Sequence, residues 1–141
     1  MRSGLVLVEL IVVMVLIGLV ALVAVPDLAS AIDRAAVREE TLRVVAALDA
    51  ARGAAVRFGG DVALTLADTA YQVTAVTGSD TTVPWRRPGP VQRGITLAGG
   101  GAPLHFGPAG LATGASNRTI VVARGNTAHR IVISRLGRIT Y

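Results

Sequence analysis

The stretch that decides the fold lies near the N-terminus, where residues 4–26 read GLVLVELIVVMVLIGLVALVAVP. Between Leu5 and Val25 there are 21 residues, and only Glu9 among them is charged. A helix of this length extends ~30 Å, which is the thickness of the hydrocarbon core of a bilayer. Because the segment is apolar on every side, it predicts a transmembrane helix over residues 5–26 rather than an amphipathic surface helix.

Glu9 is the unusual residue of this segment. A carboxylate at the centre of an inserted helix costs about 2.5–3.5 kcal/mol, and a position near the helix end, such as that of Glu9, costs less. Two interpretations of Glu9 follow from the sequence. The side chain either lies at headgroup depth, where water solvates it, or it pairs with a group that the nearby sequence does not supply, apart from the N-terminus.

The apolar run has two further interpretations, which are a cleaved secretory signal and a plain signal anchor. Ala29-Ser30-Ala31 has the small-residue pattern of a signal-peptidase site, although the apolar run is long for a cleaved secretory signal. A plain signal anchor is the other. All three interpretations place the downstream domain outside the cytoplasm, because Arg2 favours a cytoplasmic N-terminus.

The helix is predicted to continue beyond the membrane. Pro26 lacks a backbone N–H, so we expect the helix to kink or restart there. Residues 27–58 are rich in Ala, Leu, Arg and Glu and predict an amphipathic continuation that ends at Phe58-Gly59-Gly60. Glu39 and Arg43 form an i,i+4 pair. One apolar stripe on the helical wheel is expected to pack on the domain, and it consists of Leu28, Ile32, Ala35, Leu42 and Ala46.

After Gly60 the hydrophobic period becomes that of β-strands, so residues 59–141 predict a small β-rich domain and the chain an α+β fold. Expected strands cover residues 62–66, 71–75, 95–97, 104–106, 119–123 and 129–133, with a short last strand near Ile139. Residues 67–69 and 124–126 are expected to be hairpin turns. The segment 78–90 contains three prolines and is expected to be a loop, and residues 99–101 are expected to be a flexible break.

The charges are distributed unevenly along the chain. All 14 basic residues are Arg, and the net charge is +5. Six Arg and all nine acidic residues precede Thr81, whereas the remaining 61 residues contain eight Arg and no acid. This half of the chain predicts a positive surface that could meet nucleic acid, anionic headgroups or an acidic protein.

No catalytic constellation is visible. His105 and His129 are the only imidazoles, and no metal-ligand spacing surrounds either of them. Residues 99–101 are not followed by a helix start, so they do not form a phosphate cradle. There is no cysteine and no nucleophile elbow. We therefore expect no catalytic residue, no metal site and no cofactor, and we do not expect an enzyme.

The N-terminal pattern resembles the class III signal of type IV pilins and type II secretion pseudopilins. A short leader, residues 1–4, ends in Gly4, and Glu9 and Pro26 follow at the family's offsets. The resemblance implies that a prepilin peptidase cleaves between Gly4 and Leu5 and N-methylates Leu5. It also implies that Glu9 pairs with the terminal amine of a neighbouring subunit and that Pro26 kinks the helix. Leu5 stands where most members have Phe.

Three further stretches resemble the GspH/FimT family of minor pseudopilins, and they are Ala50–Ala55, Phe106–Gly110 and Ser134–Ile139. The resemblance implies a pilin-like fold, in which one long N-terminal helix packs on a small antiparallel β domain. It implies three partners: the prepilin peptidase, other pseudopilins or pilins in a filament, and an inner-membrane assembly platform. The subunit would be a single-pass protein of the bacterial inner membrane, with its N-terminus cytoplasmic and its domain periplasmic.

Two functions are consistent with this family. The first is a minor pseudopilin of a type II secretion system. The second is a FimT-like minor pilin that binds DNA for natural transformation, although Thr140 replaces the second Arg of that group's G-R-x-R ending. The alternative to DNA binding is a merely solvated surface. The candidate DNA-binding residues are Arg86, Arg87, Arg130, Arg135 and Arg138.

Overall fold

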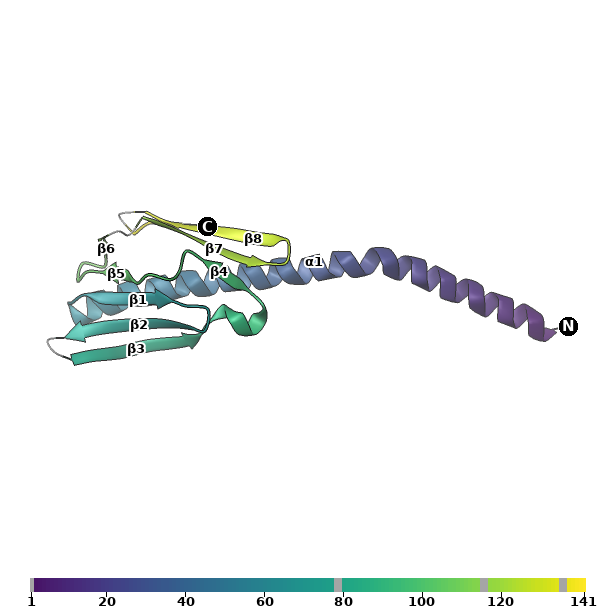
Figure 1. The fold of residues 1–141 in the computed structure, drawn as a ribbon, viewed down its shortest axis with the longest axis horizontal. Helices are drawn as coiled ribbons and strands as arrows, with labels where there is room; N and C mark the ends of the chain where they lie inside the picture. Colours follow the sequence, from purple (N-terminus) through teal and green to yellow (C-terminus); the bar gives the residue numbers. More distant parts are fainter. Residues whose placement is uncertain (1, 78–79, 115–116, 135–136) are drawn as a thin grey trace.

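The protein was studied as a computed structural model, which describes residues 2–77, 80–114, 117–134 and 137–141. Its dominant element is the helix α1 (Arg2–Phe58) of 57 residues, which continues through Pro26 without restarting. Figure 1 shows the N-terminal part of α1 projecting far from the β domain, whereas the C-terminal part lies along it. The helix ends as expected, because Gly59 adopts φ 61° and the Gly60 N–H donates to the Ala55 carbonyl at 3.3 Å.

The predicted stripe of α1 does not pack on the domain, so this prediction was wrong. Leu28, Ile32 and Leu42 are 64%, 52% and 49% exposed, and Ala35 and Ala46 are exposed as well. The opposite face of the helix is buried instead, and it consists of Val37, Glu40, Thr41, Val44, Ala47, Leu48, Ala51, Ala54 and Ala55. Small residues dominate this face because they let the sheets approach the helix backbone closely.

One sheet has five antiparallel strands in the order β3-β2-β1-β5-β6. Its strands are β1 (Val62–Leu66), β2 (Ala70–Thr77), β3 (Asp80–Pro88), β5 (Leu104–Phe106) and β6 (Ala112–Thr113). Alternation along β1 buries Val62, Leu64 and Leu66 against α1. The expected turn at residues 67–69 joins β1 to β2, and the Ala67 N–H donates to the Ala70 carbonyl at 3.0 Å.

The expected loop over residues 78–90 was the second wrong prediction, since residues 80–88 form strand β3. β3 is an edge strand of its sheet, and among the described residues it pairs only with β2. Pro84 and Pro88 are tolerated there because an edge strand has one side on which no backbone donor is needed. A register shift between Val73 and Ala75 marks an irregularity in the pairing of β2 with β3.

The second sheet has four antiparallel strands in the order β4-β7-β8-β9. They are β4 (Thr96–Ala98), β7 (Arg118–Arg124), β8 (Thr127–Ile133) and β9 (Ile139–Thr140). A 3₁₀-helix, η1 (Pro90–Arg93), connects β3 to β4. β7 and β8 form the expected hairpin, which closes at the pair Arg124–Thr127 around Gly125 with φ 55°.

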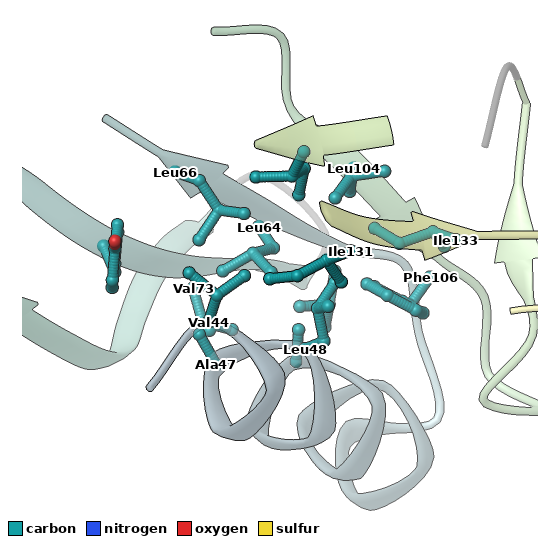
Figure 2. Packing of buried hydrophobic residues seen from close by; sticks show 14 of the residues in the cluster. Val44, Ala47, Leu48, Leu64, Leu66, Val73, Leu104, Phe106, Ile131 and Ile133 are labelled. Carbon is teal, nitrogen blue, oxygen red and sulfur yellow. The ribbon is translucent and has the colours of Figure 1, made fainter. Parts of the chain in front are cut away.

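Both sheets pack on α1, and the core lies between this helix and the two sheets. Figure 2 shows Val44, Ala47 and Leu48 of α1 facing Leu64 and Val73 of the five-stranded sheet. Ile131 and Ile133 of the four-stranded sheet and Phe106 of β5 complete the same cluster. The predicted α+β class and the long helix packed on antiparallel strands are therefore confirmed.

Residues 99 and 100 are not the flexible break that we expected. Gly99 has φ 84°, and a Cβ atom built on it would lie 2.2 Å from the Thr119 carbonyl oxygen. Gly100 is buried, and its Cβ would lie 2.5 Å from the Leu66 carbonyl oxygen. Glycine is thus required at both positions because two backbones approach each other closely.

Candidate functional surfaces

The apolar part of α1 is one candidate surface. The helix is long and apolar enough to cross a membrane, and its most apolar part is not buried by the domain. Large apolar side chains are exposed from Val6 to Val25, and Glu9 is exposed among them. Gly4 and Leu5, the predicted processing site, lie in the helical backbone. This arrangement fits a single-pass membrane anchor that carries a C-terminal domain.

A buried carboxylate joins α1 to the rest of the domain. Glu40 is completely buried and accepts a hydrogen bond from the Tyr71 hydroxyl at 2.7 Å. The Arg93 Nε donates to the other carboxylate oxygen at 3.1 Å, and a second guanidinium nitrogen contacts the same oxygen. Both oxygens of a buried carboxylate must be satisfied, and Glu40 meets this requirement with one partner from β2 and one from η1. The side chain thereby joins these two elements to α1.

The protonation of Tyr71 follows from this environment. Burial is the main cause that raises the pKa of Tyr71, and the hydrogen bond to Glu40 raises it further. The hydroxyl therefore remains a donor to Glu40 at all physiological pH values. In contrast, Glu39 is exposed, and the hydrogen bond from Arg43 lowers its pKa. The predicted i,i+4 pair is thus present, but on the solvent side.

A second contact between helix and sheet lies at the tip of the β7–β8 hairpin. Arg124 Nε lies 3.0 Å from Asp33 Oδ1, and both side chains are partly buried. A Cβ on Gly125 would lie 2.5 Å from Asp33 Oδ2, so the turn touches the same carboxylate. The uneven charge of the sequence is therefore partly matched within the fold, since acids on α1 bind Arg93 and Arg124 from the acid-free half.

The candidate DNA-binding residues are not gathered in one place. Arg86 and Arg87 are neighbours on β3, so their side chains lie on opposite faces of that strand. The guanidinium carbon of Arg87 lies 5.7 Å from the centroid of the Trp85 ring. Both side chains line a cavity together with the buried Tyr71 of β2. Arg130 belongs to the other sheet and is exposed on β8.

Arg138 lies beside β9, where it lines a groove of about 570 Å³ together with Asp49 and Arg52 of α1. Arg135 lies outside the described residues. Of the two histidines, His105 pairs with Thr113 across β5 and β6, and His129 lies on β8. Within the residues that the structure describes, no group of three or more His, Asp or Glu side chains could hold a metal ion.

The three sequence motifs meet around one side chain. Arg52 of the helical motif donates to the Gly137 carbonyl of the C-terminal motif. A Cβ on Gly110, from the turn after Phe106, would lie 3.1 Å from Arg52 Cγ. Segments about 30 to 85 residues apart in sequence therefore form one packed junction at the end of α1. Figure 1 shows this end of the helix beneath β5 and β6, far from the N-terminus.

The family model of the type II transport protein GspH matches residues 40–137, which include all of this junction and both sheets up to β9. This is more than half of the chain. The chain belongs to the GspH family. The match begins at Glu40, so the buried carboxylate is within it and the apolar span is not. No curated protein and no solved structure shows a significant match to the chain.

Membership in the GspH family assigns the chain a pilin-like role related to type II secretion. GspH proteins are structural pseudopilins rather than enzymes, and they assemble with other pseudopilins in a filament.

Glu40, Arg93, Asp33 and Arg124 were not predicted as functional or structural residues. Glu40 was missed because the predicted apolar stripe, with Leu28, Ile32 and Leu42, lies on the other side of the helix. Val37, Val44 and Ala47 with Glu40 repeat at intervals of three and four residues, so the buried face carries a helical period. A carboxylate within that period, and a half-chain rich in Arg but free of acid, together indicate a buried ion pair.

Proposed function

We propose that this chain is a minor pseudopilin of a type II secretion system, which assembles into a periplasmic pseudopilus that drives protein export. The observation that carries the proposal is the GspH match to the domain, joined without interruption to an exposed apolar helix. The helix holds the subunit in the inner membrane before assembly, with the N-terminus cytoplasmic and the domain periplasmic. In the filament, the apolar helices of neighbouring subunits cover one another.

The exposed stripe of α1 supports this proposal. Leu28, Ile32 and Leu42 are exposed and continue the apolar surface of the span along the helix. Exposed large apolar side chains in such a row typically mark an interaction surface. Glu9 sets the axial register, because a carboxylate within an apolar helix bundle requires a partner such as the terminal amine of the neighbouring subunit. The inner-membrane assembly platform adds subunits to this bundle.

The first prediction concerns processing. Coexpression of the full chain with a prepilin peptidase is expected to remove residues 1–4 and to add one methyl group to Leu5, which intact-protein mass spectrometry measures directly. A Gly4→Leu variant serves as the control and should keep its full mass, because the peptidase requires the small residue before the cut. An N-terminus at Ile32, after the Ala-Ser-Ala sequence, would instead identify a cleaved secretory signal.

The second prediction concerns the role in the cell. Deletion of the gene in its own bacterium is expected to abolish export of type II secretion substrates and to leave DNA uptake unchanged. A Glu9→Ala copy should enter the membrane in normal amounts but fail to restore export, because the subunit loses its partner in the filament. Culture-supernatant assays and transformation frequencies measure both outcomes in the same strains.

The alternative is a FimT-like minor pilin of a type IV pilus that binds duplex DNA. The exposed Arg130 and Arg138 and the acid-free half favour it, and binding through phosphates alone would weaken steeply with salt. If deletion lowers transformation and leaves export intact, and if Arg138→Ala reproduces the loss, the DNA receptor replaces the secretion pseudopilin as the function.

A further inference from the structure

Strand β8 has a free outer edge. β9 pairs only with Val132 and Ile133, and within the described part of the chain no strand pairs with the remainder of β8 on that side. The β7–β8 ladder closes at Arg124–Thr127 on a two-residue turn. Backbone groups alternate in such a ladder, so the N–H and C=O groups of Ala128 and Arg130 point away from β7. These four groups form an open template for a further strand.

The other described sheet edges are less suited to accept a strand. β3 contains Pro84 and Pro88 and has an irregular pairing with β2. β4 has three residues, and β6 has two. Proline, irregular pairing and short length are the usual protections of a sheet edge. β8 has none of these along residues 127–131. The ion pair of Arg124 with Asp33 also holds its hairpin on α1.

A groove runs beside this free edge, between β8 and α1. A cavity of about 220 Å³ is lined by Arg38, Thr41 and Leu42 of the helix together with His129 of β8 and Tyr141. Tyr141 also lines the larger groove of about 570 Å³, which Val45 of α1 lines as well. A strand added to β8 would therefore direct alternate side chains toward Leu42 of α1 and into this cavity.

The charge of the edge specifies the chemistry of the added strand. No acidic residue belongs to any strand of the four-stranded sheet. Arg130 is exposed and lies opposite Val121, on the face away from α1. A residue paired with Arg130 from the free side would lie about 5 Å away, where an opposite charge is favourable and a like charge is not. The strand that fits thus alternates an acidic residue with apolar residues.

A second copy of this chain does not fit the edge. Antiparallel pairing of β8 with β8 would place Arg130 close to its counterpart, which is unfavourable. Such pairing would also reverse the direction of one subunit. Figure 1 shows β8 running along α1, so the apolar span of the reversed subunit would point away from the shared membrane. Antiparallel self-pairing of β8 is therefore unfavourable, and a segment of another protein with an acidic residue fits the edge better.

We propose that the free edge of β8 binds an extended segment of a partner protein by strand addition, with an acidic residue opposite Arg130 and apolar residues facing α1. Backbone hydrogen bonds to Ala128 and Arg130 supply the affinity, and Arg130 and the cavity beside Leu42 supply the selectivity. The site is a property of the domain and is independent of the type of filament in which the subunit assembles.

The test uses the full chain in detergent micelles and two capped peptides, Val-Glu-Val-Thr-Val and Val-Lys-Val-Thr-Val. In an antiparallel register their second residue lies opposite Arg130 and their fifth opposite Thr127, so neither peptide overlaps the pairing of Val132 with β9. NMR amide exchange is expected to show slower exchange at Ala128 and Arg130 when the Glu peptide is added. Titration should show that the Glu peptide binds about fivefold more tightly than the Lys peptide. In an Arg130→Glu variant the preference should reverse in favour of the Lys peptide.

The matched control is Arg86→Glu, which changes an exposed Arg on a strand of the other sheet and should keep the preference for the Glu peptide. Three results would each overturn the proposal. The first is an unchanged exchange rate of the Ala128 and Arg130 amides at millimolar peptide. The second is an unchanged preference for the Glu peptide in the Arg130→Glu variant. Protection that rises with protein concentration in the absence of peptide would identify a second copy as the occupant.

Discussion

Replacing Glu40 by Ala is expected to lower the free energy of unfolding by about 2–4 kcal/mol. The change leaves the Tyr71 hydroxyl without its acceptor and the Arg93 guanidinium without its counter-ion. Breaking a buried pair from one side typically costs 3–5 kcal/mol, and the value here is reduced because the Arg93 side chain is 29% exposed. Denaturant unfolding of the full chain in micelles measures the loss.

The neighbouring Glu39→Ala variant is the control, because Glu39 lies one position away on α1 but on the solvent side. We expect no measurable change in stability for this variant. Tyr71→Phe should lose about 1.5–3 kcal/mol, because it leaves one oxygen of the buried carboxylate without its donor. If Glu40→Ala and Glu39→Ala proved equally stable, the carboxylate would not be what joins α1 to β2 and η1.

Replacing Gly99 by Ala is the second large effect, with an expected loss of about 3 kcal/mol. Two physical terms add here. The positive φ of Gly99 costs an L-residue roughly 1–2 kcal/mol. The new methyl group would also approach the Thr119 carbonyl at a distance that no side chain tolerates, and relieving this contact separates β4 from β7.

The control is only two residues away. Gly101 is exposed, has no positive φ, and a Cβ built on it meets nothing within 4 Å. Gly101→Ala should therefore be neutral or slightly stabilising, because it reduces the freedom of the unfolded chain. Thermal unfolding of the two variants, measured side by side, distinguishes a close backbone approach at Gly99 from a flexible glycine segment. A flexible glycine segment would make them alike, whereas the close approach at Gly99 predicts a clear difference.

The large-scale features of the fold could be predicted because they depend on local pattern. The 21-residue apolar run, the glycines after Phe58 and the alternation in β1, β2, β7 and β8 each carry their own signal. The buried face of α1 could not be predicted from residue size. The buried face consists largely of Val and Ala, whereas Leu28, Ile32 and Leu42 lie on the exposed face, and close packing of two sheets favours small side chains.

Strand β3 was missed for a different reason. Pro84 and Pro88 argue against a strand in the middle of a sheet, and the position of a strand at an edge is a property of the whole topology. The arrangement of Arg86 and Arg87 was missed for the same reason. As a loop, residues 86 and 87 would form one basic patch, whereas as a strand they divide between two faces. Glu40 and Arg93 are 53 residues apart, so only the tertiary fold brings them together.

The continuity of α1 has a mechanical consequence. A domain that is joined to its span by a flexible linker can reorient, because the linker absorbs displacement. Here about 11 residues of helix, roughly 16 Å, separate Pro26 from Val37, the first helix residue of the core. A continuous helix of this length is stiff and does not absorb a displacement as a flexible linker would. An axial force on the N-terminal end would reach the domain undiminished, and a rotation of the span would turn both sheets through the same angle.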